Sequence, residues 1–527
     1  MPIFRPLLVT ALLAVPAAAA PPTKATSAWW GHVAVLASDA YEGRLTGSPG
    51  YLKAADYVAG QFKAAGLRPG GARGTYLQPV AFEEQIVDQT ASTVALTRGA
   101  SATPLAVGPD ILLPAREPQP AAIAAPMVFI GYGINLPEAG YDDFAGLDLK
   151  GKVVVVLGGG PASLSAALKS HASAYAFPKA VTAAGAIGVV RIANPKSMDI
   201  PWQRQIGLAS QPGMRLADAK LQNYPGAMFT ASVNPARAEA LFAGSGHSFA
   251  ELLALADAKQ PLPRFALAAG IKATVVARSR SLSSPNVVGV LPGSDPTLKA
   301  EHVVLSAHLD HLGVGEAVAG DRIYNGAMDN ASGVASLIEV ARALRGKPRK
   351  RSLVFVAVGG EEKGLLGSRA FAENPTVPKP SIVADINMDM FLPIFPMKHL
   401  LVFGENESSL GVDARAVAAA QGYDLLPDAE PDRNLFVRSD QYSFIRTGVP
   451  SIALKIKYAE GSPEAAFEKT WTTARYHAPQ DDVDQPVDLG AADAFNRYLV
   501  ALTTRVADNA ARPAWNGDSF FRRFAAK

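Results

Sequence analysis

The segment from residue 280 to residue 510 alternates short apolar runs with amphipathic stretches, and this alternation restricts it to an α/β fold. The apolar runs predict strands at 303–306, 352–358, 382–386 and 451–454. Between the first two runs, apolar residues recur at helical spacing and predict a helix over residues 332–344. We therefore predict a mixed sheet with flanking helices.

The chain has 527 residues, more than one hydrophobic core usually holds, so at least two domains are expected. Between residues 93 and 275, proline and glycine separate short β-like runs, and histidines and acids do not cluster. We expect this segment to be a β-rich domain inserted into a larger one. The predicted divisions are 24–92 and 276–510 for the two parts of the larger domain, 93–275 for the insert, and 511–527 for a C-terminal tail.

Residues 1–20 are predicted to be a cleaved signal peptide. Arg5 precedes an apolar stretch at 7–15, and small residues at 17–20 offer a cleavage site. The stretch is short for a bilayer span, and no later segment is long and apolar enough to serve as a membrane anchor. We therefore expect the mature chain to be periplasmic or secreted.

The sequence contains no cysteine, which excludes thiol catalysis, cysteine-ligated zinc and a lipid-modified N-terminal cysteine. Any metal must then be held by His, Asp and Glu side chains. The formal net charge is +3, and no dense basic stripe of the kind found in nucleic-acid-binding proteins is present. We expect no nucleic-acid partner, and the sequence does not indicate an oligomeric state.

Two candidate metal ligands adjoin the first predicted strand and the helix after it. His308 follows the strand at 303–306, and Asp310 is expected to accept a hydrogen bond from its second ring nitrogen. Asp329 lies at the start of the helix, where it either caps the helix or bridges two metal ions. Because ligands of α/β sheets bind at the carboxyl ends of the strands, both positions favour a site there.

Three acids follow the next two strands. Glu361 and Glu362 come after the strand at 352–358, and adjacent carboxylates repel each other unless a cation is near. One of them could bind a metal while the other faces a bound water. Asp389 lies between two methionines, and such apolar flanks make an unpartnered charge costly. Asp385 is the competing candidate, for which we expect a structural role.

His477 lies in a loop after the strand at 451–454 and could complete a second metal site. Two histidines and four carboxylates at strand ends or adjoining loops are about what two zinc ions need when they share a carboxylate at roughly 3.5–4 Å separation. The other histidines are expected to be structural or surface residues: His32, His171, His247, His302, His311 and His399.

Five ordered motifs resemble the M28 family of zinc aminopeptidases, and the resemblance covers nearly the whole mature chain. They are His-x-Asp at 308–310, Met-Asp-Asn-Ala-Ser-Gly at 328–333, Glu-Glu-x-Gly-x-x-Gly-Ser at 361–368, Met-Asp-Met at 388–390 and Tyr-His-x-Pro-x-Asp at 476–481. The insert, with runs at 151–156 and 183–190, resembles a protease-associated (PA) domain.

The resemblance implies a fold of the zinc-dependent exopeptidase type and hydrolysis of the N-terminal residue of peptide substrates. It also implies two zinc ions per chain and a cis peptide bond between Asp329 and Asn330. The implied roles are one zinc held by His308 and Asp389, a second held by Glu362 and His477, a bridge by Asp329, and a general base at Glu361.

Two departures from the family pattern concern residues near the site. Many relatives carry Ser-Asp-His where this chain has Ser439-Asp440-Gln441, and some have an oxyanion-stabilising tyrosine near the position of Phe436. Tyr442 and Tyr458 are the alternatives for that tyrosine.

Other functions remain open from the sequence. A carboxypeptidase or dipeptidase on the same scaffold would use the same metals, and a carboxypeptidase would need a cationic group for the substrate carboxylate. A glutaminyl-cyclase-like transferase would need one zinc. A non-catalytic PA-domain binding protein would be expected to lose metal ligands, and the candidate set is complete.

Overall fold

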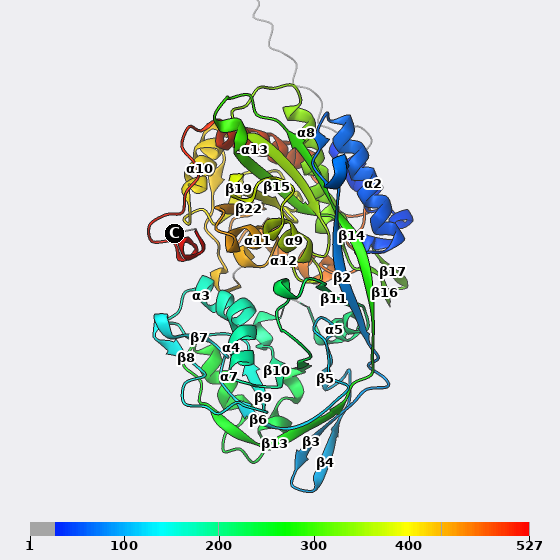
Figure 1. Cartoon of the computed structure of the whole chain (residues 1–527), viewed down its shortest axis with the longest axis vertical. Helices are drawn as coiled ribbons and strands as arrows, with labels where there is room; N and C mark the ends of the chain where they lie inside the picture. Colours follow the sequence, from blue (N-terminus) through cyan, green and yellow to red (C-terminus); the bar gives the residue numbers. More distant parts are fainter. Residues whose placement is uncertain (1–26, 199, 434, 526–527) are drawn as a thin grey trace, which may run out of the picture.

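A computed structural model describes residues 27–198, 200–433 and 435–525, which form two lobes, each built around its own sheet (Figure 1). The predicted signal peptide at residues 1–20 lies outside the described residues. The upper lobe in Figure 1 holds both the N-terminal helices and the second half of the chain, and the lower lobe holds the segment between them.

The sheet of the upper lobe has ten strands, and its centre is parallel. Strands β18 (Ser352–Val358), β15 (His302–His308), β19 (Ile382–Met388) and β22 (Ser451–Lys457) run side by side in the same direction. The outer strands make the sheet mixed, as predicted. They are β11 (Gly213–Leu216), β2 (Leu77–Val87) and β14 (Ala277–Leu291) beyond β18, with β1 (Arg68–Pro69) on β14, and β20 (His399–Phe403) and β21 (Asp424–Leu425) beyond β22.

The central strands are apolar throughout because helices cover both faces of the sheet. In β18, Leu353 and Phe355 pack on one side, whereas Val354 and Val356 pack on the other. The first side carries α1 (Ala28–Leu36), α2 (Pro49–Ala64), α8 (Ser332–Leu344), α10 (Ser409–Gln421) and α13 (Leu489–Asp508). The second side carries α9 (Leu366–Glu373) and α11 (Gln441–Arg446).

The predicted elements of this lobe are present, and three of the strands continue further than the sequence indicated. Helix α8 and strand β18 have the predicted bounds. Strands β15, β19 and β22 extend past the predicted ends by two, two and three residues. These extensions bring His308 into β15 itself and place Asp389 directly after β19.

The lower lobe contains an eight-stranded sheet. Its order is β4 (Ser101–Leu105), β3 (Thr93–Arg98), β13 (Phe265–Thr274), β6 (Ala122–Phe129), β9 (Val153–Leu157), β10 (Gly188–Ile192), β12 (Phe229–Val233) and β5 (Ile111–Leu112). Helices pack around it, among them α3 (Ala166–His171), α4 (Phe177–Ala183), α5 (Trp202–Ala209), α6 (Glu239–Phe242) and α7 (Phe249–Asp257).

The two lobes are connected by strands that run between them as well as by the loops that link them. Strands β2 and β14 run along one side of the molecule from the upper lobe toward the lower one (Figure 1). Strand β11 belongs to the segment of the lower lobe but pairs with β2, so it extends the sheet of the upper lobe. This pairing is not predicted by any pattern in the sequence. In the part of the chain that the structure describes, no helix has the length and apolar character needed to cross a membrane.

The side chain of Leu305 in β15 is fully buried between the helices and the sheet. A substitution of Leu305 therefore tests the assignment of β15 to the core. We expect Leu305→Ala to lower the free energy of unfolding of the upper lobe by about 2–5 kcal/mol, since the cavity cannot collapse completely. The matched control is Val314→Ala at a side chain that is 51% exposed, where the change should stay within about 0.5 kcal/mol. Calorimetric unfolding measures both, and equal shifts would contradict the assignment.

Candidate metal centre

The six candidate residues meet at the carboxyl edge of the parallel strands. His308 ends β15, Glu361 and Glu362 follow β18, and Asp389 follows β19. Asp329 lies in the turn Ala327–Ala331 that leads into α8. His477 follows α12 (Pro463–Arg475), which itself comes after β22. Residues as far apart in sequence as Asp329 and His477 are thereby in contact.

Asp329 lies between two imidazoles, one on each of its carboxylate oxygens. His308 Nε2 is 3.2 Å from Asp329 Oδ1 and 3.4 Å from Asp389 Oδ1. On the other side, His477 Nε2 is 3.3 Å from Asp329 Oδ2 and 3.1 Å from Glu362 Oε2. Two sets of ligand atoms therefore share one carboxylate, which is the arrangement that a bridged pair of cations requires.

His311 also belongs to this cluster, although we expected it to be a structural or surface residue. The side chain is fully buried, and its Nδ1 lies 2.8 Å from Glu362 Oε1 and 4.0 Å from Asp329 Oδ2. Its Nε2 is buried without a hydrogen-bond partner among the described residues. The only local signal was its position three residues after His308, which does not distinguish a site residue from a core histidine.

The charges of the cluster hold protons on its imidazoles when no cation is present. Burial opposes the charged form of His477, but Glu362 and Asp329 outweigh it and raise its pKa to about 10. Burial likewise opposes the charged form of His308, and Glu361, Asp329 and Asp389 raise its pKa well above the ordinary value. The site therefore favours positive charge, as a metal-binding site must.

Glu361 differs from its neighbour Glu362 in its titration. Burial raises the pKa of Glu361 well above its ordinary value, and the charge of Glu362 adds to this effect. Burial acts on Glu362 in the same direction, but His477 and His311 outweigh it and lower its pKa. Glu361 thus holds a proton more readily than Glu362, which suits proton transfer at the first residue and cation binding at the second.

The role expected for the Asp310 carboxylate is wrong. His308 Nδ1 donates to the backbone carbonyl oxygen of Asp310 at 3.1 Å, whereas the carboxylate oxygen is 3.9 Å away. The carboxylate instead accepts hydrogen bonds from the backbone N–H groups of Glu361 and Glu362, at 3.1 and 3.4 Å. Asp310 therefore fixes the backbone that presents both glutamates, and the loop after β18 draws its carboxylate away from the imidazole. Asp385, the competing candidate, accepts from Ser306 within the sheet.

The turn that carries Asp329 is held from the C-terminal part of the chain. Asp481 accepts hydrogen bonds from the backbone N–H groups of Met328 and Asp329, both at 2.9 Å. The peptide bond between Asp329 and Asn330 is cis, which confirms the expectation from the family resemblance. Asn330 Nδ2 donates to the carbonyl of Met388 at 2.9 Å, so this turn is tied to the segment of Asp389.

Arg44 holds the same edge from the N-terminal part of the chain. Its guanidinium is completely buried and, within the described residues, donates only to the backbone carbonyls of Leu36, Leu309, Asn325 and Gly326, at 2.6–2.9 Å. Burial lowers its pKa to about 10, so it keeps its charge at neutral pH. The Arg44 guanidinium thus joins the segment after β15 to the segment before Asp329.

The two tyrosines considered as oxyanion donors are both engaged elsewhere. The Tyr442 hydroxyl lies 2.7 Å from His171 Nδ1 in the other lobe. The Tyr458 hydroxyl accepts from the backbone of Ile394 and Phe395 and donates to Leu392. Gln441, which stands where many relatives have histidine, is buried and bonds Asn387 and the carbonyl of Phe436. Tyr476, which we named only as part of the motif at 476–481, stacks on His477, with ring centroids 3.9 Å apart.

A cleft of about 580 Å³ opens onto the cluster from between the lobes. Glu361, Glu362, Tyr476 and His477 form one wall, and residues of the lower lobe, such as Tyr175, form the other. Arg204 of α5 donates to the carbonyl of Tyr476 at 3.0 Å and fastens the lower lobe beside His477. A ligand in this cleft would touch both lobes and the acidic edge.

The ligand atoms fit divalent zinc, whose usual protein donors are imidazole nitrogen and carboxylate oxygen where cysteine is absent. His308, Asp329 and Asp389 place one atom each within 4.8 Å of one another, and so do His311, Asp329 and Glu362. Fold and cluster together define a class: an α/β protein with a cluster of carboxylates and imidazoles that could hold metal ions at the carboxyl edge of its sheet.

Comparison with known proteins identifies the family of one part of the chain. Residues 286–503 match the family described as Peptidase family M28, so this part of the chain is a peptidase family M28 domain. The fold resembles that of the solved aminopeptidase from Aneurinibacillus sp. strain AM-1, with a TM-score of 0.52 and 19% identity over 92% of this chain and 94% of that one.

Two curated relatives match parts of the chain. Aminopeptidase YwaD of Bacillus subtilis (strain 168) is 29% identical over 164 residues, which are 30% of this chain and 33% of the relative. The probable lipoprotein aminopeptidase LpqL of Mycobacterium tuberculosis (strain ATCC 25618 / H37Rv) is 27% identical over 259 residues, 44% of this chain and 48% of the relative. The matches thus cover a third and about half of the lengths of these two relatives.

Arg44 offers a test of how the metal edge is held. We expect Arg44→Met to lower the free energy of unfolding by at least about 3 kcal/mol, because four buried carbonyl oxygens lose a charged donor. The change should also reduce the metal content of the purified protein. Arg68→Met, at an exposed arginine on β1, is the control and should change neither quantity. Thermal unfolding together with elemental analysis distinguishes the two variants, and unchanged stability in Arg44→Met would refute the role.

Proposed function

We propose that this chain is a metallo-aminopeptidase that binds two zinc ions and hydrolyses the N-terminal residue of peptides. The observation that carries the proposal is the position of Asp329, with one carboxylate oxygen facing His308 and the other facing His477. The M28 domain and the aminopeptidase names of the relatives support the same activity.

His308 and Asp389 would hold one zinc, Glu362 and His477 the other, and Asp329 would bridge them. When bound, zinc would lower the pKa of a water molecule and polarise the scissile carbonyl. His311 Nδ1 donates a hydrogen bond to Glu362 and would orient the Glu362 carboxylate toward the zinc ion. His308 Nδ1 is occupied by the carbonyl of Asp310, which leaves Nε2 as the metal-binding nitrogen.

Glu361 would act as the general base. It accepts the proton of the attacking water and then delivers that proton to the amine that leaves. Its raised pKa suits this exchange, because a carboxylate that holds a proton readily can both take it and return it near neutral pH. The backbone N–H groups of Glu361 and Glu362 donate hydrogen bonds to Asp310. These bonds would keep the Glu361 carboxylate in the same position during both proton transfers.

The segment from 93 to 275 would supply the far wall of the cleft as a PA-like insert, with 24–92 and 276–510 forming the peptidase domain. The signal peptide at residues 1–20 would direct the chain to the periplasm or the exterior. Both proposals rest on sequence patterns. Proteolysis of the purified protein tests the domain bounds, and N-terminal sequencing of the mature protein tests the leader.

The activity is tested with aminoacyl-p-nitroanilides. We expect the zinc-loaded protein to release p-nitroaniline, and Glu361→Gln to lower kcat by at least about a thousandfold while about two zinc ions remain bound, because only proton transfer is removed. Glu316→Gln, at an exposed glutamate of β16 (Gly313–Val318), is the matched control and should keep full activity. Absence of cleavage with both zinc sites filled would disprove the aminopeptidase.

Zinc binding itself should depend on pH. Without metal, His477 has a pKa of about 10 and is protonated at neutral pH, whereas zinc binds the neutral imidazole. For each proton that zinc binding releases, the apparent zinc affinity should therefore rise by about tenfold per unit increase in pH between about pH 6 and about pH 8. Titration calorimetry in buffers of different ionisation enthalpy counts the protons released. His477→Asn should release fewer, and His247→Asn, on the lower lobe, should behave like the wild type.

A further inference from the structure

The cleft above the metal centre is rich in arginine. Among the described residues that line it are Arg116, Arg191, Arg369 and Arg438. Apart from the two glutamates of the metal centre, its lining includes one carboxylate, that of Glu117. Several positive charges therefore face a space in which a substrate would lie, and the carboxypeptidase alternative requires a cationic group for the substrate carboxylate.

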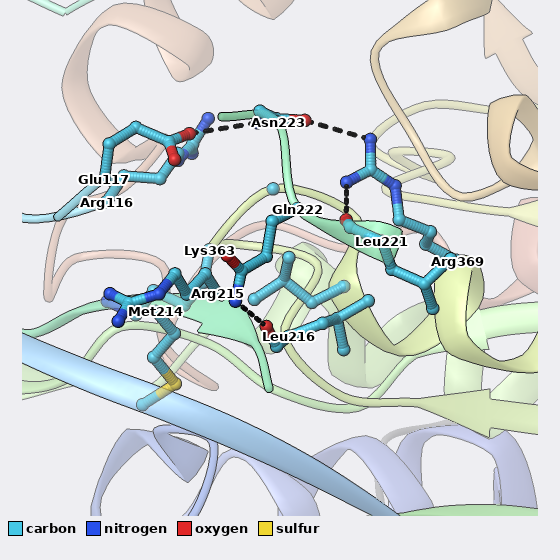
Figure 2. A pocket seen from close by; sticks show the side chains of 12 residues that line it. Arg116, Glu117, Met214, Arg215, Leu216, Leu221, Gln222, Asn223, Lys363 and Arg369 are labelled. Carbon is cyan, nitrogen blue, oxygen red and sulfur yellow. Dashed lines mark hydrogen bonds between the residues drawn. The ribbon is translucent and has the colours of Figure 1, made fainter. Parts of the chain in front are cut away.

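Two of these charges are used to hold the cleft wall together. Arg369 of α9 donates to the carbonyl of Leu221 at 2.7 Å and to Asn223 Oδ1 at 3.1 Å. Asn223 in turn donates to Glu117 at 3.0 Å, and Figure 2 shows this chain of contacts. Arg191 lies over the ring of Phe177, 4.6 Å from its centroid. Arg438 also interacts with another residue, so Arg116 is the one of these four arginines to consider for a ligand.

The Arg116 guanidinium is exposed and donates no hydrogen bond to another residue in the described parts of the chain. Its position is nevertheless defined. A Cβ atom placed on Gly364 would lie 3.2 Å from Arg116 Cζ, so the guanidinium rests against the loop that carries Glu361 and Glu362. A Cβ on Gly213 would lie 2.5 Å from the backbone nitrogen of Arg116, so strand β11 packs directly on this backbone.

The distance to the metal centre suits a short substrate. Gly364 is two residues after Glu362, so their Cα atoms are at most about 7.6 Å apart. A peptide residue spans about 3.3–3.6 Å, so a carboxylate on the first residue after the cleaved bond lies within reach of this position. Guanidinium groups bind carboxylates through charge-assisted, often paired hydrogen bonds.

We propose that Arg116 binds a carboxylate on the first residue after the cleaved bond, so that the enzyme prefers dipeptides or peptides with an acidic residue there. This inference rests on the proposed aminopeptidase function for its substrates. The carboxylate has two possible sources, the C-terminus of a dipeptide and an acidic side chain, which share the same chemistry. The arginine is supplied by the lower lobe, so the segment from 93 to 275 takes part in substrate selection.

The test compares Leu-Ala, Leu-Ala-amide, Leu-Glu-amide and Leu-Lys-amide as substrates of the zinc-loaded protein. We expect kcat/KM to be roughly ten- to hundredfold higher for Leu-Ala, for Leu-Glu-amide, or for both, than for Leu-Ala-amide. Arg116→Gln should abolish this difference and leave Leu-Ala-amide within about twofold of wild type. Arg278→Gln, an exposed arginine of β14 that does not line the cleft, should preserve it.

The pattern of substrates identifies the source of the carboxylate. A preference confined to Leu-Ala assigns it to the peptide terminus, and a preference confined to Leu-Glu-amide assigns it to the side chain. Equal rates for all four substrates would overturn the proposal, and so would an Arg116→Gln variant that loses activity equally on all of them.

A binding measurement separates this proposal from the proposed function. Calorimetry with a reduced-bond isostere of Leu-Ala, as the acid and as the amide, needs no catalysis. Tighter binding of the acid to the wild type, lost in Arg116→Gln, supports the carboxylate site even if no substrate is cleaved. Equal binding of acid and amide would overturn the site even if aminopeptidase activity is present.

Discussion

The carboxylates gathered at one edge of the central sheet are the constraint on which the rest of the structure depends. Asp329, Asp389, Glu361 and Glu362 lie within a few ångströms of the same imidazoles. Buried charge of one sign is costly unless opposite charge or hydrogen-bond donors compensate it. Histidine compensates it in the metal-free chain, and cations would do so when bound. A site with this charge needs a rigid surround, because repulsion would otherwise separate its members.

That surround comes from parts of the chain that are far apart in sequence. Arg44 binds four backbone carbonyls around the site, and Asp481 accepts the N–H groups of the turn that carries Asp329. Asp310 does the same for the backbone of Glu361 and Glu362. Each of these groups binds main chain and none provides a ligand atom to the predicted set. The N-terminal helices and the C-terminal segment are therefore as necessary to the site as the strands between them.

The strands, helix α8 and the ligand positions could be predicted because local patterns carry them. Runs of apolar residues define buried parallel strands, and acids or histidines directly after such runs must lie at one edge of the sheet. The acceptor of His308 Nδ1, the contact of His311 with Glu362 and the pairing of β11 with β2 could not be predicted in this way. Each depends on where a segment remote in sequence comes to lie. A strand of four residues, such as β11, also leaves no periodicity to detect.

The distribution of charge in the cleft has a consequence for orientation. A free peptide is a dipole, with an ammonium group at one end and a carboxylate at the other. With the zinc ions in place most of the acidic charge of the upper lobe would already be compensated, so the charge that would orient a peptide is that of Arg116, presented by the lower lobe. When the peptide carboxylate is on the residue after the cleaved bond, this attraction would place that bond beside the acidic edge. A longer peptide carries its terminal carboxylate out of reach, so it would gain this contact only through an acidic side chain.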